Sequence, residues 1–413
     1  MTFKNTSTAS MSLVASAVIA LLAAVPAHGA ENRAQRYTAG LGGTDMTTML
    51  SPGWYGQVAA IHYHANKLRD QNGDSAVLAS GTLSAATVAG AAGLVAATGA
   101  GNPALATPIG NSVAAQLAGQ GLSYNTKVSN FRADAYVALP RVTYISANKF
   151  LGAHVGFTAM LPLIERQTSL EGQTFFSDRS AAINQGILNA TGNATLASGA
   201  TASTVSRLQT GVNAQVNPAL AKRNGSNTGL GDLEFAPVLN WEIGDHQTAT
   251  LTPTLIVPTG DYHKENAVNP GFGKFYTFRP SFQYGFIGDG WDVGARAIVS
   301  FNTRNKDTLY HSGTMFNVDF AAMKFVTEDV RLGLQGYLVR QLTKDASDDA
   351  LVQASINAAD GAKMRAYALG PALGWIVNGG EMVVEGKLLK EFGARNRAEG
   401  TTYMLVLSKP FGL

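Results

Sequence analysis

The sequence predicts an all-β membrane protein: a transmembrane antiparallel up-and-down β-barrel of about twelve strands with two long Ala/Gly/Ser-rich outer loops. The first observation is composition, because only 14% of the 413 residues are charged and 45 are glycine. A water-soluble domain usually carries about 25% charged residues. After residue 29 the chain nevertheless has no helix-length run of strongly apolar residues. Only helices and closed barrels can span a bilayer, so hydrophobicity hidden in alternating strands explains both facts.

Composition also excludes several classes of function. The absence of cysteine excludes disulfide scaffolds, zinc fingers and thiol catalysis. A net charge of +3 is too small to predict a nucleic-acid partner. His62 and His64 share a strand face at a spacing that two metal ligands could use, but no third ligand is near them in sequence. We therefore predict no metal and no cofactor.

The N-terminus has the pattern of a secretory signal peptide over residues 1–29. Lys4 is followed by an apolar run over residues 11–25 and then by small residues, so cleavage is expected after Ala27 or Gly29. The alternative is an N-terminal membrane anchor, for which the run is short. Residues 30–53 are expected to form an N-terminal periplasmic segment, and residues 54–413 the outer-membrane barrel.

Alternation with a period of two is the second observation, and it is clearest over residues 151–163. Leu151, Val155 and Phe157 lie on one face of this strand, and His154 and Thr158 lie on the other. A strand would place the first row in lipid and the second in the lumen. Further strands are predicted over 54–64, whose facing stays open, and over 131–139, 233–241, 251–257, 276–286, 291–301, 316–320, 332–334, 367–375, 382–388 and 403–411.

The same alternation predicts which polar side chains line the lumen. Over 131–139 the odd positions are apolar, so Arg132 and Asp134 are expected to point inward. The lumen candidates are Arg132, Asp134, His154, Asp232, Glu234, Glu242, Arg279, Arg296, Arg331 and Glu385. Their charges allow two interpretations: opposed basic and acidic walls that orient a passing solute, or an internal salt-bridge network that braces the barrel.

The connections between strands are the third observation, because short and long ones alternate as in outer-membrane barrels. Tight turns are predicted at 146–149, 244–246, 288–290, 327–329 and 378–380. The longest outer loops are predicted at 65–129 and 164–229, and they include tracts without charge at 75–126 and 180–206. These tracts could pack inside the barrel mouth or against the outer leaflet, or form flexible low-complexity loops.

The four tryptophans fit this topology. Trp54 and Trp291 begin predicted strands, whereas Trp241 and Trp375 end them. All four are therefore expected at the periplasmic rim, where an aromatic girdle belongs.

Several motifs together resemble one family. They are 230–233 (LGDL), 257–262 (VPTGDY), 278–280 (FRP), 305–313 (NKDTLYHSG), Gly336-Tyr337 with Gln341 and Asp345, and 51–55 (SPGWY). The chain resembles the outer-membrane proteins named for the phenol meta-cleavage pathway, a family that includes sphingosine-inducible outer-membrane proteins. The resemblance implies a channel-like role in uptake of aromatic or other hydrophobic compounds. Within these motifs the outer-loop candidates are Thr259, Asp261, Asn305, Thr308 and Tyr310, which either fix the loops or touch a solute.

The leading hypothesis is an outer-membrane channel or transporter for small hydrophobic or aromatic solutes, whose partners are that solute and outer-membrane lipid. The alternative is a structural or surface-display barrel that acts through its long loops. An outer-membrane hydrolase with His154 as general base is disfavoured, because no serine with an orienting partner is recognisable beside it. We therefore do not predict an enzyme, and the sequence leaves the oligomeric state open.

Overall fold

The structure is a computed structural model that describes residues 35–411. The predicted signal peptide and the first residues of the 30–53 segment lie outside the described residues. The chain divides into two compact units. Within the described residues, the barrel unit comprises 35–75, 131–169 and 223–411, and the helical unit comprises 76–130 and 170–222.

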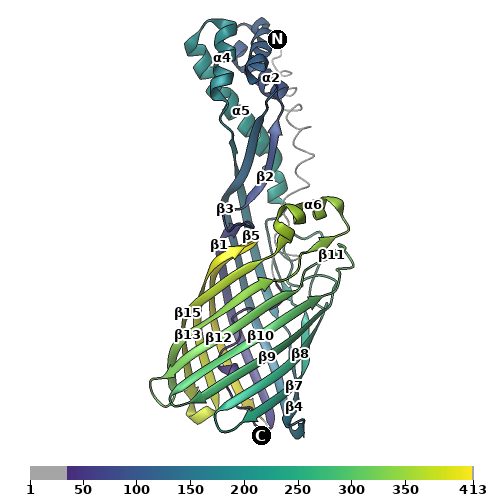
Figure 1. Cartoon of the computed structure of the whole chain (residues 1–413), viewed down its shortest axis with the longest axis vertical. Helices are drawn as coiled ribbons and strands as arrows, with labels where there is room; N and C mark the ends of the chain where they lie inside the picture. Colours follow the sequence, from purple (N-terminus) through teal and green to yellow (C-terminus); the bar gives the residue numbers. More distant parts are fainter. Residues whose placement is uncertain (1–34, 412–413) are drawn as a thin grey trace. The chain divides into compact units, whose positions relative to one another are not determined.

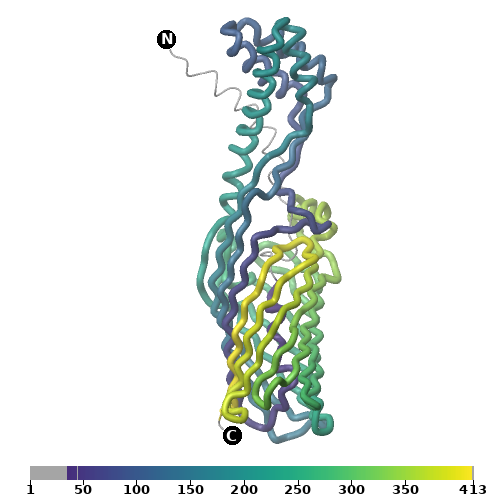
Figure 2. Tube along the Cα trace, turned by 90° about the vertical axis from the view of Figure 1, so that its left-hand side faces the viewer, coloured from purple at the N-terminus to yellow at the C-terminus, as the bar shows by residue number. Residues whose placement is uncertain are grey.

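The barrel unit contains a closed antiparallel barrel of 12 strands, so the predicted architecture is confirmed. The strands are β1 (Gly53–Arg69), β3 (Leu122–Phe150), β4 (Ala153–Met160), β7 (Leu233–Ile243), β8 (Gln247–Val257), β9 (Thr277–Gly288), β10 (Trp291–Asn302), β12 (Met315–Phe325), β13 (Val330–Gln341), β15 (Arg365–Val377), β16 (Met382–Arg395) and β17 (Arg397–Phe411). Each strand pairs with the next around the ring, as the green strands of Figure 1 illustrate. The first strand, β1, closes the ring by pairing with β17 on one side and β3 on the other, and β17 is the yellow strand beside β1 in Figure 2.

Alternation along the strands sorts polar from apolar side chains as the sequence predicts. In β10, Asp292 and Arg296 are buried, whereas Trp291, Val293 and Phe301 are exposed. The same arrangement recurs around the barrel, where the exposed row of most strands consists of large apolar residues. This inside-out pattern is that of a barrel whose outer surface meets lipid.

The facing of β3 is the exception, and the prediction for it is wrong. Leu139 is buried and packs with Leu41, Ile61 and other apolar residues inside the barrel, so the odd positions of β3 point inward. Tyr136 is exposed on the outer surface, and Arg132 and Asp134 share its side of the strand. The strand alternates as predicted, but its apolar row faces inward because Leu41 provides an apolar contact inside this sector of the barrel.

The first predicted tight turn is also displaced. Residues 146–149 belong to the end of β3, which carries a register shift between Ile145 and Lys149. The turn itself lies at Leu151 and Gly152, both with positive φ (49° and 80°). The other four short turns lie where they were predicted.

The long connections between barrel strands contain further elements of the barrel unit. Part of β5 (Leu163–Phe176) pairs with β6 (Gly225–Leu230). The short strands β11 (Tyr310–His311) and β14 (Ala346–Ser347) pair with each other beside α6 (Ala350–Ala358) and the 3-10 turn η5 (Asp360–Ala362). At the end with short turns, the 3-10 turn η6 (Asn378–Gly380) joins β15 to β16.

The helical unit is formed by the two tracts that were predicted as loops. It comprises β2 (Val77–Leu83), α2 (Ala85–Gly99), the 3-10 turn η4 (Pro103–Leu105), α3 (Ala106–Leu117), α4 (Ser180–Thr191) and α5 (Ala194–Ala221), with the adjoining parts of β3 and β5. Ile109, Val113, Ile187, Leu208 and Val212 are fully or almost fully buried in its core. The interpretation as flexible loops is therefore wrong, because the tracts fold together around a core of their own. Among residues 35–411, no helix is long and apolar enough to cross a membrane.

Candidate functional site

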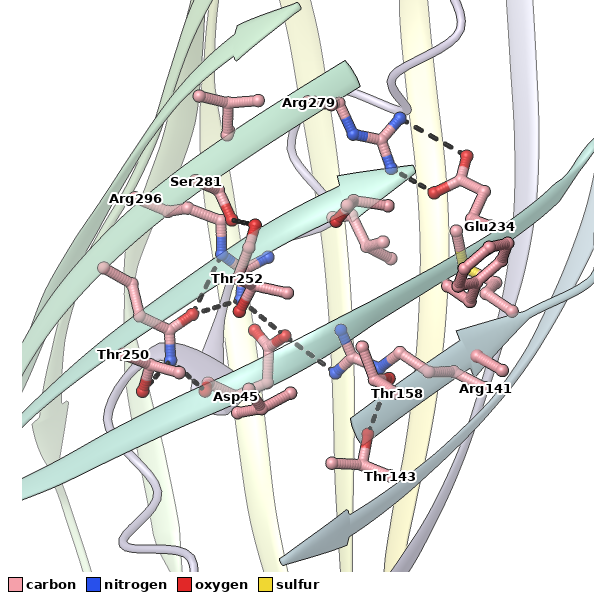
Figure 3. A pocket seen from close by; sticks show the side chains of 18 of the residues that line it. Asp45, Arg141, Thr143, Thr158, Glu234, Thr250, Thr252, Arg279, Ser281 and Arg296 are labelled. Atoms are coloured by element: carbon pink, nitrogen blue, oxygen red, sulfur yellow. Dashed lines mark hydrogen bonds and ion pairs between the residues drawn. The ribbon is translucent and has the colours of Figure 1, made fainter. Parts of the chain in front are cut away.

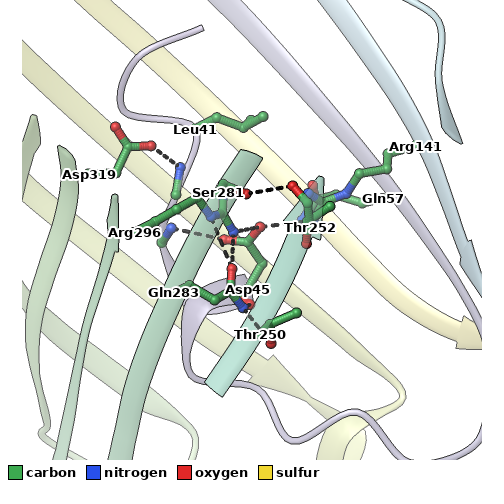
Figure 4. A network of polar contacts seen from close by, with 12 residues as sticks. Leu41, Asp45, Gln57, Arg141, Thr250, Thr252, Ser281, Gln283, Arg296 and Asp319 are labelled. Carbon is green, nitrogen blue, oxygen red and sulfur yellow. Dashed lines mark hydrogen bonds and ion pairs between the residues drawn. The ribbon is translucent and has the colours of Figure 1, made fainter. Parts of the chain in front are cut away.

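The lumen of the barrel is occupied by residues 35–50, which we call the plug. Arg36 of the plug forms an ion pair with Asp232 (2.9 Å), and Asp45 forms one with Arg296 of β10 (2.7 Å). Figure 4 shows Leu41 and Asp45 among side chains that project from the inner face of the strands. The expectation that 30–53 is a periplasmic segment is therefore wrong for the plug, which threads the barrel.

A buried carboxylate on β12 holds the first part of the plug. Asp319 accepts hydrogen bonds from the backbone N–H groups of Gly40 (2.9 Å) and Gly42 (2.8 Å), and also from the Tyr37 hydroxyl. Hydrogen bonds to an ionised group are roughly twice as strong as neutral ones. Burial and the nearby Asp319 raise the pKa of Tyr37 well above its usual value, so the phenol remains a donor.

Asp45 holds the second part of the plug, within the 3-10 turn η3 (Thr44–Met46). Its carboxylate lies 2.7 Å from Arg296 and 2.9 Å from Arg141 of β3, and Figure 4 shows it between the two guanidinium groups. Its backbone oxygen accepts a hydrogen bond from Gln283 (3.1 Å). Burial alone would raise the pKa of Asp45, but Arg296 and Arg141 outweigh burial and hold it well below its usual range. Asp45 is thus an ionised group shared by two walls of the barrel.

Glycine lets the plug lie directly on the wall. A Cβ at Gly43 would stand 2.0 Å from Oε1 of Glu385, so any other residue here would have to displace that buried carboxylate. Gly40 has a φ of +81°, which disfavours other residues. Lys387 of β16 donates to the carbonyl oxygen of Gly42 (3.0 Å), so the plug's backbone is bonded to the wall here.

A cavity of about 110 Å³ lies beside the plug (Figure 3). Its polar lining includes hydroxyl and charged groups on β7, β8 and β9, such as Thr252 and the Glu234–Arg279 ion pair, and also Arg141, Thr158 and Arg296. Apolar side chains such as Met160 and Val238 line it as well, and Tyr37 contributes from the plug. The cavity therefore offers both an apolar surface and hydrogen-bonding groups to a small molecule.

Most of the predicted lumen residues lie inside the barrel; Arg132 and Asp134, on its outer surface, are the exceptions. Those inside are His154, Asp232, Glu234, Glu242, Arg279, Arg296, Arg331 and Glu385. Arg279 pairs with Glu234, and Arg331 pairs with Asp292. His154 contacts the backbone oxygen of Ser146 through Nδ1 (3.0 Å), and its Nε2 lies 3.8 Å from Glu242. These pairs match the salt-bridge network and not the opposed walls.

The remaining predicted residues lie at the two ends of the barrel. Trp54, Trp241, Trp291 and Trp375 all lie at the end with short turns, and Trp54 contacts Tyr144, Phe157 and Phe411 there. At the other end, Thr259 Oγ1 accepts a hydrogen bond from Leu233 N, and Asp261 accepts one from Leu230 N. Asn305 accepts from Lys274 N and Asp307 N, Thr308 accepts from Tyr310 N, and Tyr310 donates to Asp345. These contacts fix the loops.

The plug residues Arg36, Tyr37 and Asp45 were missed by the sequence-based prediction. Strand alternation carries no information about a segment without regular structure. The sequence did offer one signal, the tract Gly40-Leu41-Gly42-Gly43, whose glycines allow the backbone to approach its neighbours closely. Asp319 and Arg141 were missed as site residues for the same reason, since their partners lie on the plug.

The closed barrel with an apolar outer surface and a charged interior defines an outer-membrane β-barrel protein. The chain belongs to the family described as "putative MetA-pathway of phenol degradation", whose model matches residues 65–407. The family resemblance and the outer-membrane location predicted from the sequence are thereby confirmed. No protein of curated function matches the sequence significantly.

One of the solved structures similar to this chain shares its fold. An outer-membrane channel from Pseudomonas putida F1 has a TM-score of 0.56 at 12% identity, covering 90% of this chain and 100% of that channel. The CymD monoaromatic hydrocarbon channel has a TM-score of 0.35 at 10% identity, covering 94% and 99% of the two chains. A Pseudomonas aeruginosa FadL homologue has a TM-score of 0.33 at 8% identity, covering 87% and 91%. The first likeness places the chain in the fold of outer-membrane channels, and the other two are too low to carry an argument.

Proposed function

We propose that this protein is an outer-membrane channel for uptake of small hydrophobic or aromatic compounds, and that the plug controls passage through its lumen. The observation that carries the proposal is the way the plug is held. Asp319, Arg296 and Lys387 of the wall bind it through hydrogen bonds and an ion pair. Water can solvate these polar groups when the plug moves away, so contacts with water can replace the polar contacts that hold it.

The cavity beside the plug supports the class of solute. Its volume of about 110 Å³ is somewhat below the roughly 150 Å³ of an engineered cavity that binds benzene. A modest shift of the plug would therefore make room for one aromatic ring. Met160 and Val238 would contact the ring, and the hydroxyl of Thr252 would be available to a phenolic oxygen. The family's description, which refers to phenol degradation, points to the same class of solute.

The test measures entry of labelled phenol, an alkane, a long-chain lipid base and a small sugar into a porin-poor host with and without the protein. The proposal predicts faster entry of the apolar solutes and little change for the sugar. A variant lacking residues 36–47 should admit the solutes about tenfold faster or more, if the open state normally holds at most about 10% of the molecules. Arg304→Ala is the control, because Arg304 forms an exposed ion pair with Asp348 far along the chain from the plug.

Heat-modifiable gel migration must first show that every variant forms a folded barrel. Equal entry of all four solutes through the intact protein would replace the proposal with a general pore. No change in entry for either the intact protein or the plug-deleted variant would contradict a channel altogether.

A second candidate is surface display by the helical unit, which is favoured by its compact core of α2–α5. The variant for this test lacks 76–130 and 170–222, with Ser75 joined to Phe131 and Ser169 to Arg223. Thr168 already pairs with Gly225, so the second junction leaves a short hairpin connection. Loss of attachment to a partner with unchanged solute entry would favour display, and a change in solute entry alone would favour the channel.

A further inference from the structure

A group of polar side chains lies on the outer surface of the barrel wall, on the strands β1 and β3. His62 and His64 of β1 both approach the carboxylate of Asp134 on β3, with nitrogen–oxygen distances of 3.4 Å and 2.8 Å. Arg132 contacts the same carboxylate through Nε. Tyr136 and Tyr403, which are 49% and 48% exposed, lie on either side of His62. We call these residues the outer cluster.

The outer cluster cannot be explained by the lumen. The inward row of β1 is Gln57, Ala59 and Ile61, so His62 and His64 belong to the opposite row with exposed Val58. Ionised groups facing hydrocarbon are costly, and outward-facing ones are tolerated mainly near the interfaces. The position of the cluster along the strand therefore decides what surrounds it.

That position is close to the edge of the membrane opposite the tryptophan rim. His62 and His64 follow Trp54 by about eight to ten residues along β1. At about 3.3 Å per residue and a tilt of about 40°, they stand roughly 20–25 Å above Trp54, near the height of the apolar band of about 25 Å. The tyrosines flanking His62 are residues typical of a membrane interface. The cluster thus lies at the level of the outer-leaflet headgroups.

The chemistry of the cluster suits an anion. Arg132 has a side chain that is 59% exposed, and within residues 35–411 only its Nε forms an ion pair. Arginine presents a fork of N–H donors that matches phosphate geometry. The two imidazoles can add N–H donors beside it. Asp134 fixes all three side chains, because its carboxylate is their common partner.

The surface of the same strands continues into an apolar hollow of about 430 Å³. Its lining residues include Val58, Pro140, Val142 and Leu407. Val58 lies four residues before His62, on the same face of β1. A ligand that carries both a phosphate and hydrocarbon chains could therefore contact the cluster and the hollow together.

We propose that the outer cluster binds the phosphate of an acylated, phosphorylated glycolipid of the outer leaflet, with Arg132 as the principal phosphate ligand. This inference rests on the outer surface of the barrel and is independent of the proposed uptake function. The occupant is a lipid because the cluster faces the membrane and adjoins an apolar hollow, which a soluble phosphate would not need.

The test uses folded, full-length protein in detergent and measures binding of diphosphorylated lipid A by native mass spectrometry. Arg132→Gln should weaken binding about tenfold, the effect of losing one charge-assisted hydrogen bond of about 1.5 kcal/mol. Lys324→Gln is the matched control, because Lys324 is an exposed cation beside Trp291 at the opposite rim. This variant should bind lipid A as tightly as the unmodified protein.

Two measurements on the unmodified protein keep the proposal testable even if a variant fails to fold. Lipid A without phosphate should bind about tenfold more weakly than the diphosphorylated form. Equal binding of the two lipids would overturn the proposal, because the phosphate would then contribute nothing. Displacement of the lipid by millimolar inorganic phosphate would overturn it too, since the cluster would then be a simple anion site.

Discussion

The two units of this protein bury opposite kinds of side chain. In the barrel unit, Asp292, Arg296 and Asp319 are buried while Phe282 and Leu373 are exposed. In the helical unit, most of the buried residues are aliphatic, and the surface is rich in small polar residues. The difference follows from what each surface meets: an outer apolar surface is stable against lipid, whereas an apolar core is stable against water. Burial in one chain therefore has two meanings, which predict different responses to mutation.

The largest expected effect comes from breaking a buried charge pair in the barrel. Arg296→Ala would leave Asp45 inside the lumen with Arg141 as its remaining cation. Removing one partner of a buried pair costs about 3–5 kcal/mol, so we expect the plug to loosen by about 3 kcal/mol. Hydrogen exchange of the amides of residues 40–48 measures this change.

Arg304→Ala provides the comparison for that variant. Its ion pair with Asp348 is about half exposed on both sides, so its loss should cost less than about 1 kcal/mol. Equal protection of the plug amides in the Arg296→Ala variant and the unmodified protein would mean that the ion pairs do not hold the plug.

A smaller effect distinguishes the two kinds of apolar residue. Leu208→Ala in the core of α5 should destabilise the helical unit by about 2–3 kcal/mol, because it leaves a cavity whose cost is partly offset by the higher helix propensity of alanine. Leu373→Ala on the outer face of β15 should cost less than about 1 kcal/mol, because lipid fills the space. Hydrogen exchange of α5 and heat-modifiable migration of the barrel measure the two effects separately. Similar costs at both positions would show that the barrel's outer surface does not meet lipid.

The sequence predicted the barrel well because alternation is a local property. The twelve strands and four of the five predicted short turns depend on neighbouring residues alone, and all are present. The facing of β3 failed because it depends on a distant contact. Its apolar row meets Leu41 of the plug, so the rule that apolar residues face lipid does not apply there.

The helical unit shows a signal that was present but outweighed by composition. Leu208, Val212, Val216 and Leu220 recur every fourth residue and are all buried along α5. Such spacing is typical of one face of a helix. The Ala, Gly, Ser and Thr content of the tract suggested a loop instead, although alanine is the strongest helix former. The plug left no comparable pattern, because its contacts are single ion pairs and hydrogen bonds with residues on β3, β9, β10, β12 and β16.

The smallest expected effect concerns pH and the charge of Asp45. The folded-state pKa of Asp45 is lowered, so its ion pairs are fully formed above the unfolded value of about 3.9 and are lost only as the pH falls through the folded value. Between pH 8 and pH 5, Asp45 therefore stays ionised in the closed protein. Asp45→Asn removes that charge at every pH and should free the plug to the same extent throughout this range.

The measurement is the ratio of solute flux through the Asp45→Asn variant to flux through the unmodified protein at pH 8, 7, 6 and 5. A constant ratio is expected, because any pH effect common to both proteins cancels in the ratio. A ratio that falls toward one at pH 5 would show that Asp45 becomes protonated near that pH. In that case Arg296 and Arg141 would not lower the pKa of Asp45, and mild acid alone would release the plug.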